Sequence, residues 1–231
     1  KESELTLSHI NELGIKNIFL ATGSSWRKDG VGRSRRKPVQ GLESLQVLTP
    51  EEAIKQSPNL SGPIVVYDDE QGYLAGVIAD HLSFDEHEVI FITPASVVSP
   101  WTESTLEQKR IQKALLVSGV NVICNKTIDK AEGSSLNLKC VFTGEISLLK
   151  CSSLVMVTER IPNTTLYDQL VEQENNTEQG VAKHIQLIGD AESPGLIADA
   201  VFLGHLAAQS FEEPEQEIQK AMFMREMPSL K

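Results

Sequence analysis

Residues 63 to 123 alternate between apolar strand patterns and helical patterns, and this alternation restricts the fold more than any other feature of the chain. The strand patterns are PIVVY (63–67), EVIFIT (88–93) and VNVIC (120–124), and the helical patterns between them are QGYLAGVIADHL (71–82) and ESTLEQKRIQKALLVSG (103–119). Strands that alternate with helical stretches of about 10 to 15 residues are typical of parallel βαβ units. We therefore predict an α/β fold with a parallel sheet and helices on its faces.

Further elements flank this alternation and indicate that one domain is inserted into another. A short amphipathic helix (4–14) and a buried strand (16–23) come first, and strand SLVMVT (153–158), strand HIQLIG (184–189) and a helix starting near Ser193 come last. Three strand patterns, KTIDKAE, LNLKCVF and EISLLKC, predict an antiparallel meander. We expect a discontinuous domain at residues 1–60 and 152–231 and an inserted domain at residues 61–151. The first helix and strand have no upstream neighbours, so we also expect earlier strands in a longer polypeptide.

Charge and cysteine content exclude several classes of function. The formal net charge of -11 disfavours nucleic-acid and acidic-membrane partners. The three cysteines lack C-x-x-C spacing, which predicts neither disulfides nor a metal site and favours buried thiols in a reducing cytoplasm. No apolar run approaches the ~18 residues of a membrane span. No histidine has a partner at metal-ligand spacing and no nucleophile has a base in a motif, so we predict no metal and no catalytic residue.

The turn within VVYDDEQGYLAG (65–76) is acidic where a dinucleotide-binding fold has a glycine-rich loop. Alignment with G-x-G-x-x-G places Glu70, Gly72 and Ala75 in the three glycine positions, directly after Asp68 and Asp69. A carboxylate ~4 Å from a phosphate charge is repelled by roughly 4 kcal/mol at an effective dielectric constant of 20. The carboxylates can instead accept hydrogen bonds from the amides at the start of the helix. We therefore predict a degenerate NAD(P)-binding module that is retained as a scaffold.

The end of the next strand supports the same interpretation. An NAD site requires an acidic residue there for the ribose, and an NADP site requires a nearby arginine. The chain has Thr93 and Pro94 at this point. Both parts of the cofactor signature are therefore missing from this module.

Two other segments contain candidate binding groups. Gly189 allows a close backbone approach after a strand, and Asp190 with the following helix start suits a ribose or ribityl hydroxyl and a phosphate. The alternative is that Asp190 and Glu192 cap the helix. Residues 27–37 form a basic loop, for which we expect a solvated, mobile conformation, with docking, phosphate contact or steering of an acidic partner as alternatives.

Several further motifs occur in a defined order along the chain, and together they are more specific than any one alone. ATG (21–23), VTERIPN (157–163) and IGDAESPGLIADA (188–200) resemble motifs of the pyridine nucleotide-disulfide reductases, with Glu159 in place of a motif glycine. Together with SPWTESTLEQKRIQ and CVFTG, they make residues from about 13 to 213 similar to the C-terminal region of NADH:flavin oxidoreductases. The branch is that of trimethylamine dehydrogenase and the dimethylglycine and N-methylproline demethylases. This resemblance implies a glutathione-reductase-like, Rossmann-type three-layer fold.

The resemblance also implies cofactors, partners and site residues. It implies ADP or FAD near the ATG and GD turns, at Ala21, Thr22, Gly23, Gly189, Asp190, Ala191 and Glu192. In such a parent, an N-terminal TIM barrel carries FMN, a cysteine segment holds [4Fe-4S], and an electron-transfer flavoprotein accepts electrons; a homodimer is also implied. The barrel and cluster cysteines are absent here, so we expect this fragment not to be the catalyst. The alternatives are an NAD(P)H-dependent reductase like 2,4-dienoyl-CoA reductase and a non-catalytic interaction scaffold.

Overall fold

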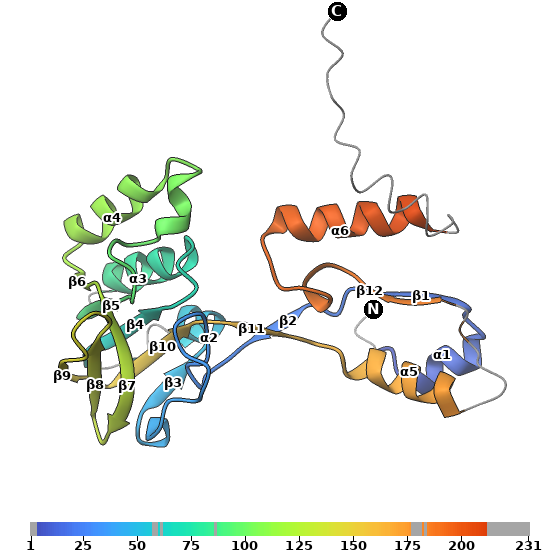
Figure 1. Ribbon diagram of the computed structural model, residues 1–231, viewed down its shortest axis with the longest axis horizontal. Coiled ribbons are helices and arrows are strands. Elements are labelled where there is room, and N and C mark those ends of the chain that lie inside the picture. The colour runs from blue at the N-terminus through green and yellow to red at the C-terminus, as the bar shows by residue number, and fades with distance from the viewer. Residues whose placement is uncertain are drawn as a thin grey trace, which may run out of the picture. The chain divides into compact units, whose positions relative to one another are not determined.

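The computed structural model describes residues 4–56, 60, 62–85, 87–176, 182 and 184–211. The chain divides into two compact units (Figure 1). One is continuous, Trp26–Arg160, and we call it the insert unit. The other combines Lys1–Ser25 with Ile161–Lys231, and we call it the split unit.

The insert unit is built on a five-stranded parallel sheet. The strand order is β3 (Gln46–Leu48), β10 (Ser153–Val157), β4 (Ile64–Asp68), β5 (Val89–Ile92) and β6 (Asn121–Ile123). Every residue of β10, β4 and β5 is buried. Strands that are buried on both faces read as continuous apolar runs, which is why these segments show no alternation with polar residues.

Different layers cover the two faces of this sheet (Figure 1). Ile64 and Val66 pack with helices α2 (Pro50–Gln56), α3 (Leu74–Phe84) and α4 (Gln108–Val117). Val65 and Tyr67 face the opposite way and pack with a three-stranded antiparallel meander. Its strands are β7 (Lys126–Glu132), β8 (Ser135–Cys140) and β9 (Ile146–Lys150). The predicted parallel sheet, helices and meander are all present, and they form three layers.

The compact units have boundaries that differ from the expected ones. The chain enters the insert unit at residue 26 instead of 61 and leaves it after residue 160 instead of 151. Strand β10 causes this difference, because it lies between β3 and β4 in the middle of the sheet. Val155 of β10 pairs with Leu48 on one side and Val66 on the other.

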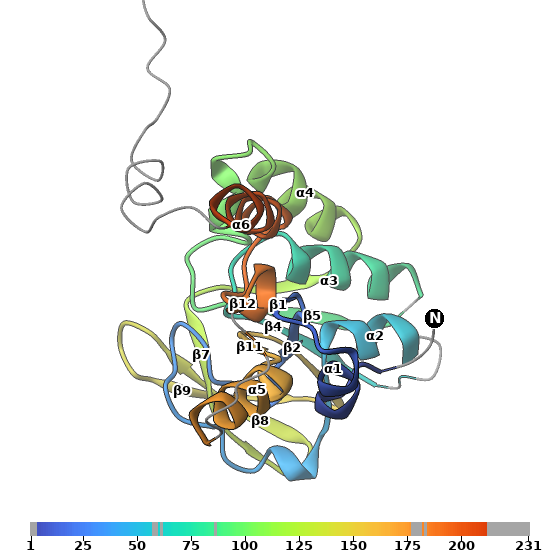
Figure 2. The same cartoon turned by 90° about the vertical axis from the view of Figure 1, so that its right-hand side faces the viewer.

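The split unit contains two parallel strands, β1 (Asn17–Leu20) and β12 (His184–Leu187). Ile18 and Leu20 pack in a core with α1 (Leu7–Leu13) and α5 (Thr165–Asn176). In Figure 2 these two helices lie on one side of the strand pair, and α6 (Ile197–Ser210) lies on the other. Phe19 points away from the core, and its ring lies 5.6 Å from that of Phe211 at the end of α6.

Helix α6 begins later than predicted. The sequence predicts a start near Ser193, whereas residues Gly189–Ala191 form a separate 3₁₀ turn, η4, and α6 begins at Ile197. Asp199 accepts a hydrogen bond from the Leu196 amide at 2.7 Å and so caps this later start. Pro194 explains the delay, because the residue before a proline avoids helical backbone angles.

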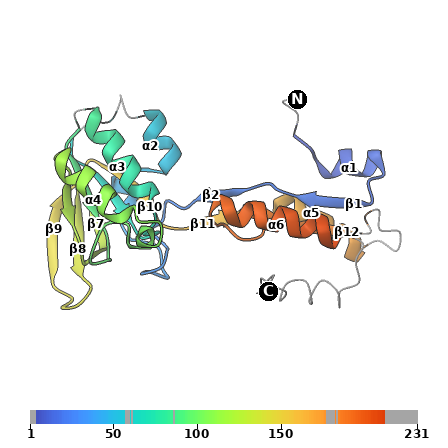
Figure 3. The same ribbon diagram turned by 90° about the horizontal axis from the view of Figure 1, so that it is seen from above.

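The chain passes between the two units twice, and both connections lie in one pair of short strands. Strands β2 (Ser24–Trp26) and β11 (Arg160–Pro162) pair with each other and lie side by side in Figure 3. The Arg27 amide donates to the Glu159 carbonyl, and the Asn163 amide donates to the Gly23 carbonyl. The paired residue numbers run in opposite directions, as in an antiparallel ribbon. The Arg160 guanidinium lies 5.3 Å from the centre of the Trp26 ring.

Candidate functional site

The ATG turn of the split unit is fixed by a single asparagine from the VTERIPN motif. The Asn163 side-chain amide donates to the Thr22 carbonyl at 3.1 Å, and the Thr22 hydroxyl donates to the Asn163 carbonyl at 2.5 Å. The Ser25 hydroxyl donates to the Asn163 side-chain oxygen at 2.8 Å. Two motifs that lie about 140 residues apart in the sequence therefore form one structural element.

The GD turn lies beside the ATG turn in the same unit. The Ile188 amide donates to the Leu20 carbonyl at 3.0 Å, which continues the β1–β12 ladder to its end. The Ser24 hydroxyl then donates to one oxygen of Asp190 at 3.1 Å, and the Gly195 amide donates to the other oxygen at 3.2 Å. Asp190 therefore ties together the ATG turn, the 3₁₀ turn and the approach to α6.

The two turns differ in how much of each predicted site residue they expose. Ala21, Thr22 and Glu192 are exposed, Gly23 and Asp190 are partly buried, and Gly189 and Ala191 are buried. Gly23 and Gly189 have φ angles of 73° and 61°, which favour glycine. A Cβ added at Gly23 would have no atom within 4 Å, so the space beside this backbone is open. At Gly189 an added Cβ would instead contact Ala200 at 3.6 Å, so the open space lies beside Gly23. Glycine backbone at two turns, an acidic side chain for a hydroxyl group and room beside Gly23 are features that suit a nucleotide.

The structure adds Ser24 and Asn163 to the residues that shape this region. Neither is among the predicted site residues, although Asn163 ends the RIPN motif and Ser24 follows the ATG motif. Asn163 has a visible signal, since a motif asparagine after proline often fixes a turn. Ser24 has none, because its contact with Asp190 spans 166 residues.

The acidic turn of the insert unit satisfies its own amide groups, as the sequence predicts. The Gln71 amide donates to Asp68 Oδ1 at 2.7 Å, and the Gly72 amide donates to Glu70 Oε2 at 2.9 Å. Both amides lie just before α3, where a dinucleotide fold would present them to a pyrophosphate. Two protein carboxyl groups therefore occupy donors that a cofactor phosphate would need.

Asp69 points toward the basic loop and holds it in place. The Ser34 hydroxyl and the Ser34 amide donate to its two oxygens at 2.5 and 2.9 Å. Gly32 passes so close that an added Cβ would lie 2.5 Å from Asp69 Oδ2. Burial raises the pKa of Asp69, and the two bonds from Ser34 oppose this effect.

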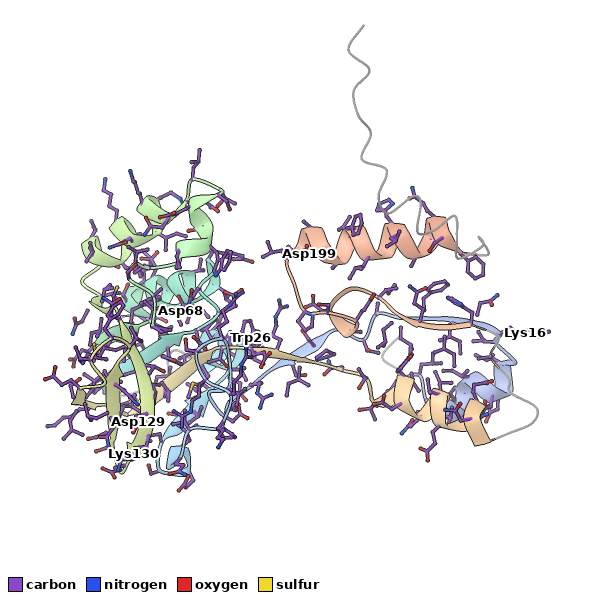
Figure 4. The ribbon with its side chains drawn as sticks, viewed as in Figure 1. Lys16, Trp26, Asp68, Asp129, Lys130 and Asp199 are labelled. Carbon is purple, nitrogen blue, oxygen red and sulfur yellow. The ribbon has the colours of Figure 1, made fainter. Side chains whose placement is uncertain are left out.

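Asp68, like Asp69, has none of its surface exposed. Figure 4 shows it where β4 ends below α3. Its Oδ2 atom is buried and has no hydrogen-bond partner in the described part of the chain. Burial raises the pKa of Asp68 well above the usual range, and the neighbouring carboxylates add to this effect. This shift favours the protonated form of the Asp68 carboxyl group.

Lys28, Arg33, Arg36 and Lys37 of the basic loop are exposed, as expected of a solvated loop, but several of its side chains also have defined partners. Ion pairs join Arg27 to Asp29 and Lys28 to Glu52. The Arg35 guanidinium donates to the Lys37 and Ile128 carbonyls. The sequence shows the positive charges, but it does not show their acceptors, of which Glu52 lies on α2 and Ile128 on β7.

Neither a cluster of metal-ligating side chains nor a membrane-spanning helix occurs among the described residues. They contain no group of three or more His, Cys, Asp or Glu side chains that could hold a metal ion. Among these same residues, no helix is both long and apolar enough to cross a bilayer.

Comparison with known proteins identifies relatives that act on amines. No family model matches the chain. Dimethylamine dehydrogenase from Hyphomicrobium sp. (strain x) is 26% identical over 240 residues, which cover 95% of this chain and 32% of the relative. The chain thus spans about a third of the length of this curated relative.

Solved structures show the same relationship. Histamine dehydrogenase from Rhizobium sp. 4-9 matches 93% of this chain with 33% identity and a TM-score of 0.88, over 33% of its own length. The 6-hydroxypseudooxynicotine amine oxidase from Pseudomonas geniculata N1 matches 91% with 29% identity and a TM-score of 0.83, over 31% of its length. Thioredoxin reductase from T. acidophilum, at 17% identity and a TM-score of 0.58, shares the fold. This chain is therefore a homologue of the C-terminal region of amine dehydrogenases of the trimethylamine dehydrogenase type, a group of flavoprotein oxidoreductases, and it has their FAD/NAD(P)-binding fold.

Proposed function

We propose that this chain is the nucleotide-binding region of an amine-oxidising flavoprotein and that its split unit holds ADP or FAD. One observation carries the proposal: the Ser24–Asp190 hydrogen bond places the ATG and GD turns side by side. The amides of the two glycine turns suit phosphate groups. Asp190 suits a ribose hydroxyl, because each carboxylate oxygen has two lone pairs and can accept a second hydrogen bond.

The insert unit has a different role in this proposal. Its sheet and helices keep the architecture of an NAD(P)-binding module, but the carboxyl groups of Asp68 and Glu70 accept bonds from the turn amides. We infer that it serves as a scaffold and does not bind NAD(P)H. In this proposal a TIM barrel with FMN and a [4Fe-4S] segment carry out amine oxidation elsewhere in the protein, and an electron-transfer flavoprotein accepts the electrons. A bound FAD would supply redox chemistry in the split unit, and a bound ADP would serve structure alone.

Calorimetric titration of the chain with ADP, FAD and NADH tests the nucleotide assignment. We expect saturable binding of ADP or FAD and none of NADH. Asp190→Asn keeps a side-chain oxygen for Ser24 but removes the charge, and we expect it to weaken binding several-fold. Glu43→Gln, an exposed change in the insert unit, is the control. Saturable NADH binding that responds to substitution of Glu70 would contradict the proposal.

A second experiment uses the complete flavoprotein that carries this chain. Heat denaturation releases non-covalently bound nucleotides, and chromatography against ADP and FAD standards identifies them. We expect ADP or FAD in addition to FMN. Rapid bleaching of the flavin absorbance by NADH or NADPH would instead indicate an NAD(P)H-dependent reductase.

A further inference from the structure

A cleft in the insert unit lies between the ends of two parallel strands and the meander. Gln71 follows β4 and Pro94 follows β5, and both line the cleft together with the turn of residues 140–144 after β8. Its volume is about 780 Å³. The carboxyl ends of the strands form the usual ligand crevice in open α/β sheets, and volumes of this order hold small organic molecules.

The cleft carries charges of both signs. Arg35 and Lys139 line it, and neither forms an ion pair with a carboxylate in the described part of the chain. Arg35 is held by backbone carbonyls, at 2.7 Å from Lys37 and 3.1 Å from Ile128, which orient its guanidinium without neutralising it. Asp129, seen on β7 in Figure 4, contributes a carboxylate. Such a lining suits a zwitterion with an excess of negative charge.

The wall of this cleft also carries a nucleophile. Cys140 is the last residue of β8 and is partly exposed. Hydrogen bonds from Thr143, through its hydroxyl and its amide, and from the Phe142 amide lower the pKa of the Cys140 thiol to about 7, and Lys126 adds to the effect. Hydrogen-bond donors and cations stabilise the thiolate, which is the reactive form.

The other two cysteines provide an internal contrast. Cys151 is buried, and burial raises its pKa to about 12. Cys124 is half-buried, and burial also raises its pKa. Of the three thiols, Cys140 alone combines a place in the charged cleft with stabilisation of the thiolate.

We propose that this cleft binds glutathione disulfide and that Cys140 is its site of reversible modification. Each glutathione half carries two carboxylates and one ammonium group. The carboxylates match Arg35 and Lys139, and the ammonium matches Asp129. The site thus recognises an anionic peptide disulfide by charge and holds it beside the thiolate.

The chemical step is a thiol–disulfide exchange. Cys140 loses its proton to solvent, and the thiolate attacks one sulfur of glutathione disulfide. A new S–S bond joins Cys140 to one glutathione, the original S–S bond breaks, and the other glutathione leaves as a thiolate. The number of S–S bonds is unchanged: the Cys140 sulfur is oxidised to the disulfide level, and the sulfur of the leaving glutathione is reduced to the thiolate level. Excess thiol reverses the step.

The test compares three disulfides on the full 231-residue chain. Glutathione disulfide is anionic, 2-hydroxyethyl disulfide is neutral and cystamine is cationic, and mass spectrometry of peptides locates each adduct. Each rate is divided by the rate of the same disulfide with Cys140 in the urea-unfolded chain. Because the net charge is -11, unspecific electrostatics would favour cystamine. We expect glutathione disulfide to give the largest ratio and to modify Cys140 first.

Two matched variants separate recognition from simple exposure. Lys139→Glu should lower the glutathione disulfide rate by about two- to five-fold, the range of an exposed charge pair, and leave the neutral disulfide unaffected. Lys150→Glu makes the same charge change at an exposed residue on β9 outside the cleft and should have no effect. Tryptophan fluorescence verifies that both variants are folded. Equal modification of Cys124, or a glutathione disulfide rate that does not respond to Lys139→Glu, would overturn the proposal.

Discussion

At the scale of single residues, the three acidic side chains at the end of β4 have different hydrogen-bond partners, and only Glu70 is partly exposed. Asp68 is completely buried with an unpartnered oxygen, Asp69 is bonded twice to Ser34, and Glu70 is partly exposed and bonded to Gly72. A carboxylate loses most of its hydration on burial, and this loss favours the protonated form. Burial therefore favours the neutral form of Asp68 in the folded protein.

This state of Asp68 makes stability depend on pH. The folded-state pKa is raised, so folded molecules keep a proton that unfolded molecules release above pH ~4. Its contribution is intact below the unfolded pKa and is lost as pH rises toward the folded pKa. The loss amounts to at most about 1.4 kcal/mol of unfolding free energy per pH unit, and Asp68→Asn removes it because asparagine does not titrate. We expect the free energy of unfolding of the variant at pH 7 to equal or exceed that of the unchanged chain. We also expect it to change less between pH 5 and pH 8 than it does in the unchanged chain.

Denaturant unfolding followed by tryptophan fluorescence measures this difference. Both tryptophans, Trp26 and Trp101, lie in the insert unit, so the signal reports on the unit that contains Asp68. Glu88→Gln changes an exposed carboxyl group near β5 and should leave the pH profile unchanged. If the unfolding free energy of Asp68→Asn fell with pH as steeply as that of the unchanged chain, another group would be responsible for the pH dependence.

Glu70 offers a second test at this scale. It asks whether the hydrogen bond from the Gly72 amide to the Glu70 carboxylate stabilises the acidic turn. Glu70→Ala removes the acceptor for the Gly72 amide and should destabilise the insert unit by about 0.5–2 kcal/mol, as for a lost helix cap. Glu70→Gln keeps an acceptor oxygen and should recover most of the loss. Urea midpoints from tryptophan fluorescence measure both. An Ala variant as stable as the Gln variant would show that the hydrogen bond contributes nothing.

The sequence predicted this turn well because its chemistry is local. Asp68 and Glu70 bond to amides two or three residues away, so their spacing alone indicates the contacts. The partner of Asp69 lies 35 residues away on the basic loop, and nothing near either residue reveals that pairing. This is why the sequence favoured a mobile loop there.

At the scale of elements, two helical glycines occupy opposite environments. Gly76 in α3 faces α4, and an added Cβ would lie 2.5 Å from Ile111 Cγ2, whereas Gly204 in α6 has no atom within 4 Å of such a Cβ. Gly76→Ala should destabilise the insert unit by about 1–3 kcal/mol through overpacking. Gly204→Ala should stabilise the split unit by about 1 kcal/mol, since alanine favours helix.

Hydrogen exchange resolves the two effects by unit. Peptides from α3 should exchange faster in Gly76→Ala, and peptides from α6 should exchange more slowly in Gly204→Ala. If the protection of α6 from hydrogen exchange did not change in Gly204→Ala, Gly204 would not be what limits the stability of this helix.

The long apolar strands were predictable, but the short strands β2, β3 and β11 and the start of α6 were not. Apolar runs such as IVVY and VIFI identify β4 and β5 directly, because strands buried on both faces need no polar alternation. The start of α6 depends on Pro194 and on the capping contact of Asp199 with Leu196, which compete with an acidic pattern that begins at Asp190. Local propensity cannot rank such alternatives.

At the scale of the whole molecule, the order of the strands in the five-stranded sheet differs from their order along the chain. Strand β10 follows the meander in sequence and pairs with β3 and β4, which precede it by roughly 90 residues or more. A boundary drawn from the sequence falls naturally between the meander and SLVMVT, because the turn there contains serines. In space this boundary removes a central strand from the sheet.

This difference in strand order suggests a test of which segment of the chain can fold by itself. Residues 26–160 contain all five sheet strands, the meander and both cores of the insert unit, and we expect this piece to fold alone with a cooperative thermal transition. Residues 61–151 lack β3 and β10, so Val65, Val66 and Tyr67 on β4 would border an open sheet edge. This shorter piece should aggregate or show no cooperative transition. Circular dichroism and gel filtration distinguish the two pieces, and a cooperative transition in the shorter one would show that β10 is dispensable.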